Sequence, residues 1–477
     1  MRDYRKFFID GQWVDPAVAA DLEVINPATE QTAGYISLGS EADVDLAVAS
    51  ARRAFGSFGR TSVAERHELL QSILAEFMRR KDDVSAAISE EMGAPKRLSD
   101  EAQSSIGAGH LQVAIEALSR FKFEERRGTT LIRKEPIGVC AFITPWNWPI
   151  NQIACKVVPA LATGCTMILK PSEIAPFSAH VWAEILDAAG LPVGVFNLIN
   201  GDGPTVGRAL SKHVGIDLIS FTGSTRAGIE VARDAADTVK RVHQELGGKS
   251  PNIILPDASI DEAVAAGVAA LMVNSGQSCN APTRMLVPKD RMDDASKAAR
   301  AAVAAVTVGI PGEDVSMGPV ASKAQWEKIQ RLIRIGVDEG ADLVAGGPDR
   351  PEGLEMGYFV KPTVFANVVP EMEIAREEIF GPVLVIMGYE DVADAVRIAN
   401  DTPYGLAAYV QGIDETQMQA VMQDLRAGQV FFNYAPIDLS APFGGYKQSG
   451  NGREWGELAF HEFLETKAVM GVKEAVT

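Results

Sequence analysis

Three residues in this chain have the types and the order that carbonyl chemistry needs, namely Asn147, Glu245 and Cys279. A thiolate adds to a carbonyl carbon, while an Asn side-chain amide and the backbone N–H at the cysteine can donate to the oxyanion. Hydride transfer to a nicotinamide would then leave a thioester. A carboxylate with a raised pKa is the general base that helps water to hydrolyse a thioester.

Cys279 stands in the polar segment 274–280, between an apolar helix expected over 261–273 and an apolar strand expected over 285–287. A Gly/Ser/Asn-rich loop between two buried elements presents a side chain on a rigid scaffold. The alternative is a buried structural thiol, because free cysteine is among the most buried residue types. Glu245 precedes two glycines, one helix-containing crossover before Cys279, so we expect the two side chains to face one another.

The segment 138–245 must position the other groups, and it alternates apolar strands with helices. This alternation predicts a parallel sheet that is covered on both faces. Ligands bind such sheets outside the carboxyl ends of the strands. The expected strands are 139–144, 166–170, 195–199 and 218–222, and the expected helices are 152–161, 178–189 and 205–213.

Polar side chains follow these strands. Asn147 follows the first strand, Lys170 and Glu173 follow the second, and Gly223 and Ser224 follow the fourth. A Gly-Ser turn at the start of a helix is an anion site, and a lysine with a glutamate can hydrogen-bond a ribose diol. A carboxylate there repels a 2′-phosphate, which favours NAD over NADP. The alternative for the Lys-Pro-Ser-Glu segment is an ordinary helix cap.

The other parts of the chain indicate scaffold, a second α/β region and a polar ribbon. Residues 284–432 again alternate strands and helices, which predicts a second parallel α/β domain with Cys279 at its start. The ribbon at 121–137 is too polar to bury itself, so we expect it to lean on a partner subunit. The scaffold is expected to be a hairpin over 7–14 and helices over 41–55, 63–80, 81–92 and 99–118.

Composition excludes several classes of protein. The chain has 477 residues, 47% of them hydrophobic and 23% charged, which is typical of a soluble globular protein of about three domains. A net charge of -18 argues against nucleic acid and anionic membranes as partners. The four cysteines show neither a disulfide framework nor a metal-ligand pattern, so we expect a reducing compartment and no metal site. No signal peptide or membrane span is expected, and the predicted location is cytoplasmic.

Eight motifs, in order along nearly the whole chain, give it a resemblance to the NAD(P)-dependent aldehyde dehydrogenase superfamily, in its non-phosphorylating, hydrolytic branch. They begin at Thr144-Pro-Trp-Asn147, Lys170-Pro-Ser-Glu173, Phe221-Thr-Gly-Ser224, Glu245-Leu-Gly-Gly-Lys249, Gly276-Gln-Ser-Cys279, Glu377-Glu378-Ile-Phe380, Asn400-Asp-Thr-Pro-Tyr404 and Pro442-Phe-Gly-Gly-Tyr446.

The resemblance implies a role for each site residue. Cys279 would be the nucleophile, Glu245 the general base, Asn147 the oxyanion donor and Lys156 part of a proton relay. Asn433 would fix a loop near the site. The implied cofactor is NAD, with NADP the alternative, and the residues expected around it are Ile143, Trp146, Lys170 and Glu173 at the adenosine half, Gly223 and Ser224 at the pyrophosphate, and Leu246, Glu378 and Phe380 toward the nicotinamide. For Phe380, core packing is the alternative role.

The resemblance also implies the architecture: two doubly wound α/β domains, a Rossmann-like cofactor domain and a catalytic domain, with a small β oligomerisation arm. We expect residues 1–120 and 138–245 in the NAD-binding domain and 246–447 in the catalytic domain. Residues 121–137 and 448–477 are expected to form the arm and tail, which would build a homodimer or homotetramer.

The expected substrate is a medium-chain, aromatic or ω-oxo-acid aldehyde. The positions that line the substrate tunnel in the family carry no arginine here, which argues against a short carboxylate-bearing aldehyde such as succinic semialdehyde; they are Trp148, Asn151, Gln152, Cys155, Ser278, Asn280 and 434–441. Asp438 either meets a polar group at the mouth or is solvated. Two other functions stay open: CoA-dependent acylation by a semialdehyde dehydrogenase, and a catalytically silent homologue.

Overall fold

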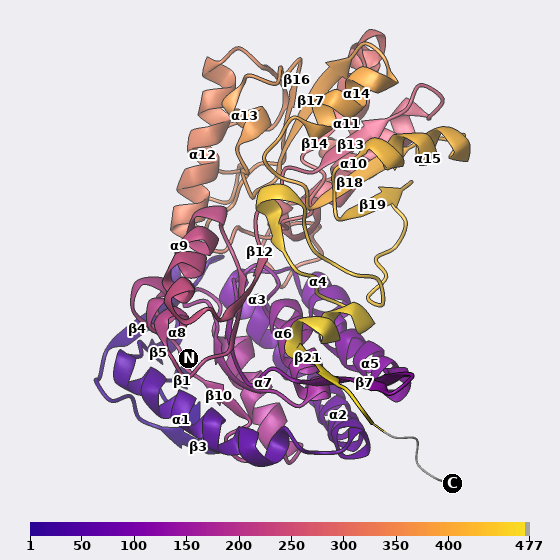
Figure 1. Ribbon diagram of the computed structural model, residues 1–477. Helices are drawn as coiled ribbons and strands as arrows, with labels where there is room; N and C mark the ends of the chain where they lie inside the picture. Colours follow the sequence, from indigo (N-terminus) through magenta and orange to yellow (C-terminus); the bar gives the residue numbers. More distant parts are fainter. Residues whose placement is uncertain (473–477) are drawn as a thin grey trace.

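The structure is a computed structural model that describes residues 1–472, and it builds the molecule around two large sheets (Figure 1). The chain completes one sheet in its first half and the other in its second half, and the C-terminal segment returns to the first half. The crossing between the sheets falls between Glu245 and Pro251. None of the helices in the described range has the length and apolar character to cross a membrane.

The first sheet has eight strands, of which the five central ones are parallel as predicted. Its edges are antiparallel, because the N-terminal hairpin adds to one side and a short C-terminal strand adds to the other. In spatial order the strands are β20 (Gly450–Asn451), β12 (Arg241–Glu245), β11 (Leu218–Thr222), β8 (Val139–Ile143), β9 (Thr166–Lys170), β10 (Phe196–Leu198), β2 (Phe7–Ile9) and β3 (Gln12–Val14).

Both faces of this sheet are covered. Alternate residues of β8 point to opposite sides: Cys140 and Phe142 join one hydrophobic core, whereas Val139, Ala141 and Ile143 join another. The first core holds α2 (Val63–Arg79), α3 (Lys81–Met92), α5 (Ser104–Arg120), α6 (Pro149–Thr163) and α7 (Phe177–Ala188), and the second holds α1 (Glu41–Phe58), α8 (Arg208–Lys212) and α9 (Thr225–Ala235).

The second sheet has seven strands, all parallel to their neighbours except the edge strand β15. In spatial order they are β15 (Asp342–Ala345), β16 (Thr363–Ala366), β17 (Val383–Tyr389), β14 (Arg284–Pro288), β13 (Pro251–Ile254), β18 (Ala407–Gln411) and β19 (Gln429–Phe432). It is covered by α10 (Ile260–Met272) and α11 (Met292–Ala304) on one face, and by α12 (Lys323–Asp338), α14 (Val392–Asn400) and α15 (Glu415–Asp424) on the other.

Two local predictions have different outcomes. The hairpin at 7–14 is confirmed, and its turn residues Asp10 and Gly11 have φ values of 55° and 72°, as a type I′ turn requires. The helix expected from residue 99 begins instead as a π-helical turn, Ser99–Gln103. The hydroxyls of Ser104 and Ser105 both donate to the carbonyl of Asp100 and widen this turn before α5 begins.

The polar ribbon forms β6 (Glu124–Arg127) and β7 (Thr130–Pro136), and β21 (Leu464–Val469) pairs with β7 in the same chain. The rest of the C-terminal segment does not extend away with this arm. Its strand β20 joins the first sheet, and Phe460 and Phe463 pack into the first hydrophobic core. The C-terminal segment therefore closes one edge of the first domain before it reaches the arm.

Candidate active site

A cavity of about 210 Å³ lies where the two domains meet, at the carboxyl ends of β8, β11 and β12. The first domain contributes side chains from the residues that follow these strands, and the second contributes the cysteine loop, α12 and the segment before β17. The lining residues are Pro145, Trp146, Asn147, Thr222, Gly223, Ser224, Leu246, Gly247, Cys279, Gln325, Lys328, Glu378 and Phe380.

A strained backbone presents Cys279 to this cavity. Asn274, Ser275 and Gly276 have φ values of 54°, 55° and 71°, so three successive residues adopt the left-handed region. A Cβ on Gly276 would lie 2.2 Å from the carbonyl oxygen of Gly381, which leaves no room for a side chain. Gln277 locks the loop by accepting from the Ala321 backbone N–H at 2.9 Å and donating to the Asn274 carbonyl at 3.0 Å.

Asn147 of the first domain forms hydrogen bonds with the same cysteine loop. The Asn147 side-chain amide donates to the carbonyl of Gln277 at 3.1 Å, and the Asn274 amide donates to the carbonyl of Asn147 at 2.8 Å. An Asn amide has two N–H bonds, so one holds the loop and the second is available at the cavity. Trp148 adds a hydrogen bond to the Ser278 hydroxyl at 2.8 Å. The structure therefore brings the predicted nucleophile and the predicted oxyanion donor together.

Cys279 lines this cavity and is partly exposed. Burial raises the pKa of Cys279 far above its ordinary value, and the charges of Glu378 and Glu245 raise it further. The backbone N–H groups of Cys279 and Asn280 oppose this by lowering the pKa of the thiol. These two amides stabilise negative charge at the sulfur, so the site can hold a thiolate once its proton has left.

Glu245 ends β12, is fully buried and does not line the cavity. The expected approach of Glu245 to Cys279 stays a prediction, but the charge of Glu245 does reach the thiol and raises its pKa. The Gly-Gly turn after Glu245 passes beside the cysteine, because a Cβ on Gly248 would lie 2.2 Å from the carbonyl oxygen of Cys279. Burial is the main cause that raises the pKa of Glu245 to about 7, which suits a general base.

Lys156 lies in α6 and is fully buried in an ion pair with Glu454. Its ammonium also donates to the Thr222 hydroxyl at 2.7 Å, and the Cys155 thiol donates to Glu454 at 3.1 Å. Burial lowers the pKa of Lys156, but the charge and hydrogen bond of Glu454, together with Cys155 and Glu245, outweigh burial and the net pKa is raised. Sequence reasoning missed Glu454. The signal was a lone carboxylate beside Trp455 in a glycine-rich segment, since a buried lysine needs a charged partner.

Glu378 and Phe380 form the wall of the cavity opposite the cysteine loop. The Glu378 carboxylate accepts the Gly248 backbone N–H at 2.8 Å, and burial raises the pKa of Glu378 to about 7. Phe380 meets Trp146 edge to face, with ring centroids 5.4 Å apart. Trp146 therefore lies beside Phe380 in this cavity, and its expected place at the adenosine half stays a prediction.

Two further lining residues, Gln325 and Lys328, come from α12, which sequence reasoning did not predict. Gln325 donates to the carbonyl of Phe380 at 2.7 Å, and Lys328 donates to the carbonyl of Glu378 at 2.7 Å. They fix the backbone of the segment that carries both predicted ligands. The missed signal was the Ser322 cap followed by apolar residues at helical spacing, with Trp326, Ile329 and Ile333 on one face.

A second cavity, of about 470 Å³, lies between the starts of α8 and α9 and is lined by Ile143, Gly203, Pro204, Gly207, Phe221 and Val231, among others. Ser224 separates it from the first cavity and caps α9 by accepting the Ala227 N–H at 3.3 Å. Of the residues predicted for the adenosine half, only Ile143 lines it. Lys170 donates to the carbonyls of Pro171 and Gly201 at 2.7 and 2.6 Å and lies 3.5 Å from Glu173.

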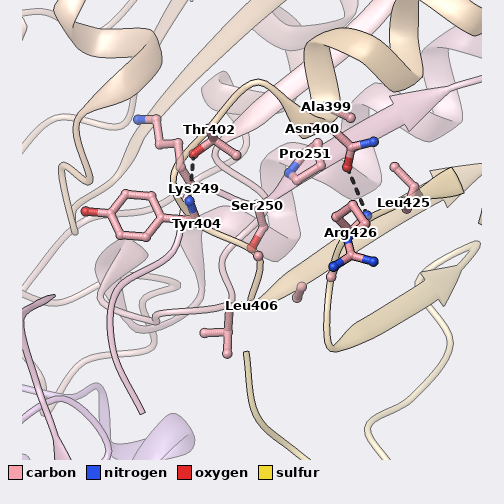
Figure 2. Close-up of a pocket in the computed structure, with 14 residues that line it drawn as sticks. Lys249, Ser250, Pro251, Ala399, Asn400, Thr402, Tyr404, Leu406, Leu425 and Arg426 are labelled. Atoms are coloured by element: carbon pink, nitrogen blue, oxygen red, sulfur yellow. Dashed lines mark hydrogen bonds between the residues drawn. The ribbon is translucent and has the colours of Figure 1, made fainter. Parts of the chain in front are cut away.

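A third pocket, shown in Figure 2, lies at the starts of β13 and β18 and is not a candidate. Lys249, Thr402 and Tyr404 stand on one side of it, and Asn400 and Arg426 stand on the other. Its volume is about 10 Å³, which accommodates one water at most. Asn400 accepts the Arg426 N–H at 2.9 Å and donates to the Asp424 carbonyl at 2.8 Å. The Asn-Asp-Thr-Pro-Tyr motif therefore ties helix ends together.

Two of the positions expected to line the substrate tunnel, Cys155 and Leu439, belong to an apolar cluster beside the cysteine. Cys155, Leu406, Phe443 and Trp455 form a cluster in contact with Cys279 and Leu439. Asn433 accepts from and donates to the backbone of Gly412, both at 3.0 Å, and so fixes the loop as expected. Asp438 is exposed and accepts the Ser440 N–H at 2.8 Å, which is a local turn contact.

Known proteins share this architecture and sequence. The chain matches the model of the Aldehyde dehydrogenase family over residues 13–469. It is 57% identical to a 3-succinoylsemialdehyde-pyridine dehydrogenase from Pseudomonas sp, over 99% of both chains.

Two solved structures are also similar. One is a variant of aldehyde dehydrogenase C from Pseudomonas syringae, complexed with NAD+ and octanal, with 50% identity, a TM-score of 0.98 and coverage of 99% of this chain and 98% of that one. The other is a Mycobacterium tuberculosis aldehyde dehydrogenase complexed with NAD+, with 38% identity, a TM-score of 0.96 and 99% coverage of both chains. The chain therefore belongs to the aldehyde dehydrogenase family, whose members oxidise aldehydes to acids.

Proposed function

We propose that this protein oxidises an aldehyde to the carboxylic acid with NAD, through a covalent intermediate on Cys279. The observation that carries the proposal is the single cavity onto which Cys279, Asn147, Glu378 and Phe380 all open. Bound NAD supplies the hydride acceptor for the oxidation. The cavity fits its nicotinamide ribose, because a Cβ on Gly247 would lie 2.6 Å from a Glu378 carboxylate oxygen and fill the space that a diol needs.

Acylation begins when the Cys279 sulfur bonds to the aldehyde carbon and the carbonyl electrons move to oxygen. The free N–H of the Asn147 amide and the Cys279 backbone N–H stabilise that oxyanion. The high pKa of the Cys279 thiol means that its proton must leave as the bond forms. Once the intermediate has been oxidised to a thioester, the same donors polarise its carbonyl for attack by water.

Hydrolysis needs a base, and Glu245 has the chemistry for it. With a pKa raised to about 7, this carboxylate is a stronger base than an ordinary carboxylate and is still partly ionised at neutral pH, so it can accept a proton from water. It must swing from its buried position to reach the thioester. Lys156 and Glu454 lie behind it as a buried acid–base pair, and their charges act directly on Glu245, so they can carry the proton away.

The proposed preference for NAD over NADP rests on Glu173, which is held 3.5 Å from Lys170. The preferred substrate is a medium-chain or aryl-substituted oxo aldehyde. The apolar cluster around Cys279 supports this, as do the octanal in one neighbour and the pyridine semialdehyde in the name of one relative. We also propose that the protein is a cytoplasmic homodimer or homotetramer whose arm, β6, β7 and β21, takes part in assembly.

The test measures NADH formation across straight-chain, aromatic and ω-carboxy aldehydes, with NAD or NADP and with or without CoA. Turnover with NAD alone, and the acid as product, would support the proposal, and the ranking of aldehydes would identify the substrate class. A requirement for CoA would shift the function to acyl transfer. The presence of Glu245, a base suited to hydrolysis, argues against that outcome. No turnover with any aldehyde would favour a silent homologue.

A further inference from the structure

His243 is a buried histidine that the mechanism above does not use, and it lies two residues before Glu245 on β12. Residues two apart on a strand share a face, so the imidazole and the carboxylate are neighbours. The His243 Nε2 lies 3.6 Å from Glu245 Oε1, and each side chain is only 2% exposed. The other ring nitrogen, Nδ1, is 3.1 Å from the Ser220 hydroxyl of β11.

The facing atoms of His243 and Glu245 make no hydrogen bond to any other group in the described chain. Nε2 of His243 and both carboxylate oxygens of Glu245 have no hydrogen-bond partner within residues 1–472. Leaving a buried polar atom unpaired is costly, so the two groups compensate one another mainly through their charges. No hydrogen bond to a third group fixes the Glu245 carboxylate in the described chain, so it is free to separate from His243.

The C-terminal segment closes the space around this pair with two glycines. A Cβ on Gly444 would lie 2.7 Å from Glu245 Oε1, and a Cβ on Gly452 would lie 2.2 Å from His243 Cδ2. Any larger residue at either position would displace one member. The cavity that holds Cys279 is lined by the loop after Glu245 but not by Glu245 itself. The carboxylate thus lies next to His243 and outside the lining of that cavity, although its charge still acts on the Cys279 thiol.

The negative charges near His243 favour the imidazolium. Glu245 comes from its own strand, and the C-terminal segment contributes Glu454 and Glu462. The nearby cation on the same strand is Arg241. Arg241 is occupied by the carbonyls of Glu462 and Leu464. The remaining charged neighbours are also paired: Lys156 of α6 contacts Glu454, and Glu462 accepts the Arg453 N–H at 3.0 Å.

Two opposing causes act on the imidazole. Burial lowers the pKa of His243, but its contact with Glu245 and the charges of Glu454 and Glu462 outweigh burial and raise it overall.

We propose that His243 is a positioning residue for thioester hydrolysis. Its imidazolium keeps the Glu245 carboxylate charged and holds it beside Gly444 until the thioester forms. The inference rests on the proposed role of Glu245 as general base. In the hydrolytic step Glu245 takes the proton of the attacking water, the water oxygen bonds to the acyl carbon, and the C–S electrons leave with the Cys279 sulfur. His243 exchanges no proton with the substrate, and it acts only through Glu245.

The test variant is His243→Gln, whose amide reaches a similar distance but carries no charge. The rate constant of acyl-enzyme decay is measured by rapid quench and intact-mass spectrometry, from about pH 5.5 to about pH 9. We expect decay at about pH 7 to slow by about tenfold, with recovery at higher pH, because the carboxylate then loses its proton without the cation. The rate of the first NADH burst should not change, because acylation does not use Glu245.

Two variants keep the outcome interpretable. In Glu245→Gln, decay as fast as in the wild type would overturn the proposed function itself. If Glu245→Gln is slow but His243→Gln keeps the wild-type rate and pH profile, the role of His243 is overturned. The matched control is His180→Gln, a buried histidine that contacts Asn200 at 2.7 Å, far from the cavity, and should leave the profile unchanged. His243→Thr, with the same expected shift, serves if His243→Gln does not fold.

Discussion

Two buried carboxylates near the junction of the domains, Glu245 and Glu378, are held in opposite ways. Glu378 lines the cavity, accepts a backbone hydrogen bond from Gly248 and has its own carbonyl fixed by Lys328. Glu245 has no hydrogen-bond partner in the described chain and faces only the His243 imidazole. Burial nevertheless raises the pKa of each carboxyl group to about 7.

Similar pKa values therefore do not imply similar roles. A carboxylate that is fixed by a backbone N–H has a defined position, as a ligand for a ribose requires. A carboxylate held by charge alone can move, as a base that must wait for a covalent intermediate requires. The two regions differ in how they restrain a charge, and mutations can separate these restraints.

The largest effect is expected from Cys279→Ala, which removes the atom that both carboxylates serve. Turnover should fall by at least about 10⁴-fold, because no other thiol lines the cavity. Binding of NAD, measured by calorimetry, should persist, since Glu378 and Phe380 are unchanged. Cys140→Ala is the control, because Cys140 is buried in the core of the first domain. Appreciable turnover by the Cys279 variant would refute covalent catalysis.

Glu245→Gln should slow hydrolysis of the thioester by about 10²–10⁴-fold, the usual contribution of a general base. A full NADH burst should precede the slow phase. In the wild type, only the charged form of Glu245 accepts a proton, so a pKa of about 7 makes the hydrolysis rate fall as the pH drops below neutrality. It should level off above that pKa. A pH-independent rate between about pH 5.5 and about pH 8 would contradict this assignment.

Glu378→Gln tests the other side of the comparison. The variant loses a charge that accepts hydrogen bonds, and such bonds contribute about 1.5–3 kcal/mol. We expect the affinity for NAD to fall by roughly 10–100-fold in equilibrium titrations. Acyl-enzyme decay should keep its wild-type rate, because Glu378 does not act as the base. The comparison fails if Glu378→Gln slows decay as strongly as Glu245→Gln does.

The smallest effect is expected from Glu173→Gln, outside both regions. Removing this charge beside Lys170 should raise the catalytic efficiency with NADP by a few-fold, about 1 kcal/mol or less, because the group is partly exposed and screened. Measurement of kcat/KM with both cofactors gives the ratio. Efficiency that does not change with NADP would show that Glu173 has no part in cofactor choice.

The sequence predicted the site well where one short segment carries the information. The strands β8, β9 and β11 are buried along their whole length and appear as apolar runs, and the polar residues that follow them could be read directly. Asn147, Gly223 and Ser224 accordingly line the predicted cavity.

Residues whose roles depend on distant contacts could not be predicted in this way. Glu454 is separated from Lys156 by 298 positions along the chain, and the contact between His243 and Gly452 depends on how the C-terminal segment folds back. The placement of Trp146 beside Phe380 has the same origin, because the two rings belong to different domains. The helix α12 is the exception: it was not predicted, although its own capping residue and apolar spacing indicate it.

The long separation between Lys156 and Glu454 also has a consequence for biosynthesis. Lys156 sits in a helix whose every residue is buried in the first domain, yet its counter-charge is made 298 residues later. Leaving one member of a buried ion pair alone costs roughly 3–5 kcal/mol. A ribosome-bound chain that lacks residue 454 must therefore keep α6 loosely packed. Water is excluded from this interior only when Glu454 pairs with Lys156, and the same pairing completes the buried charge network.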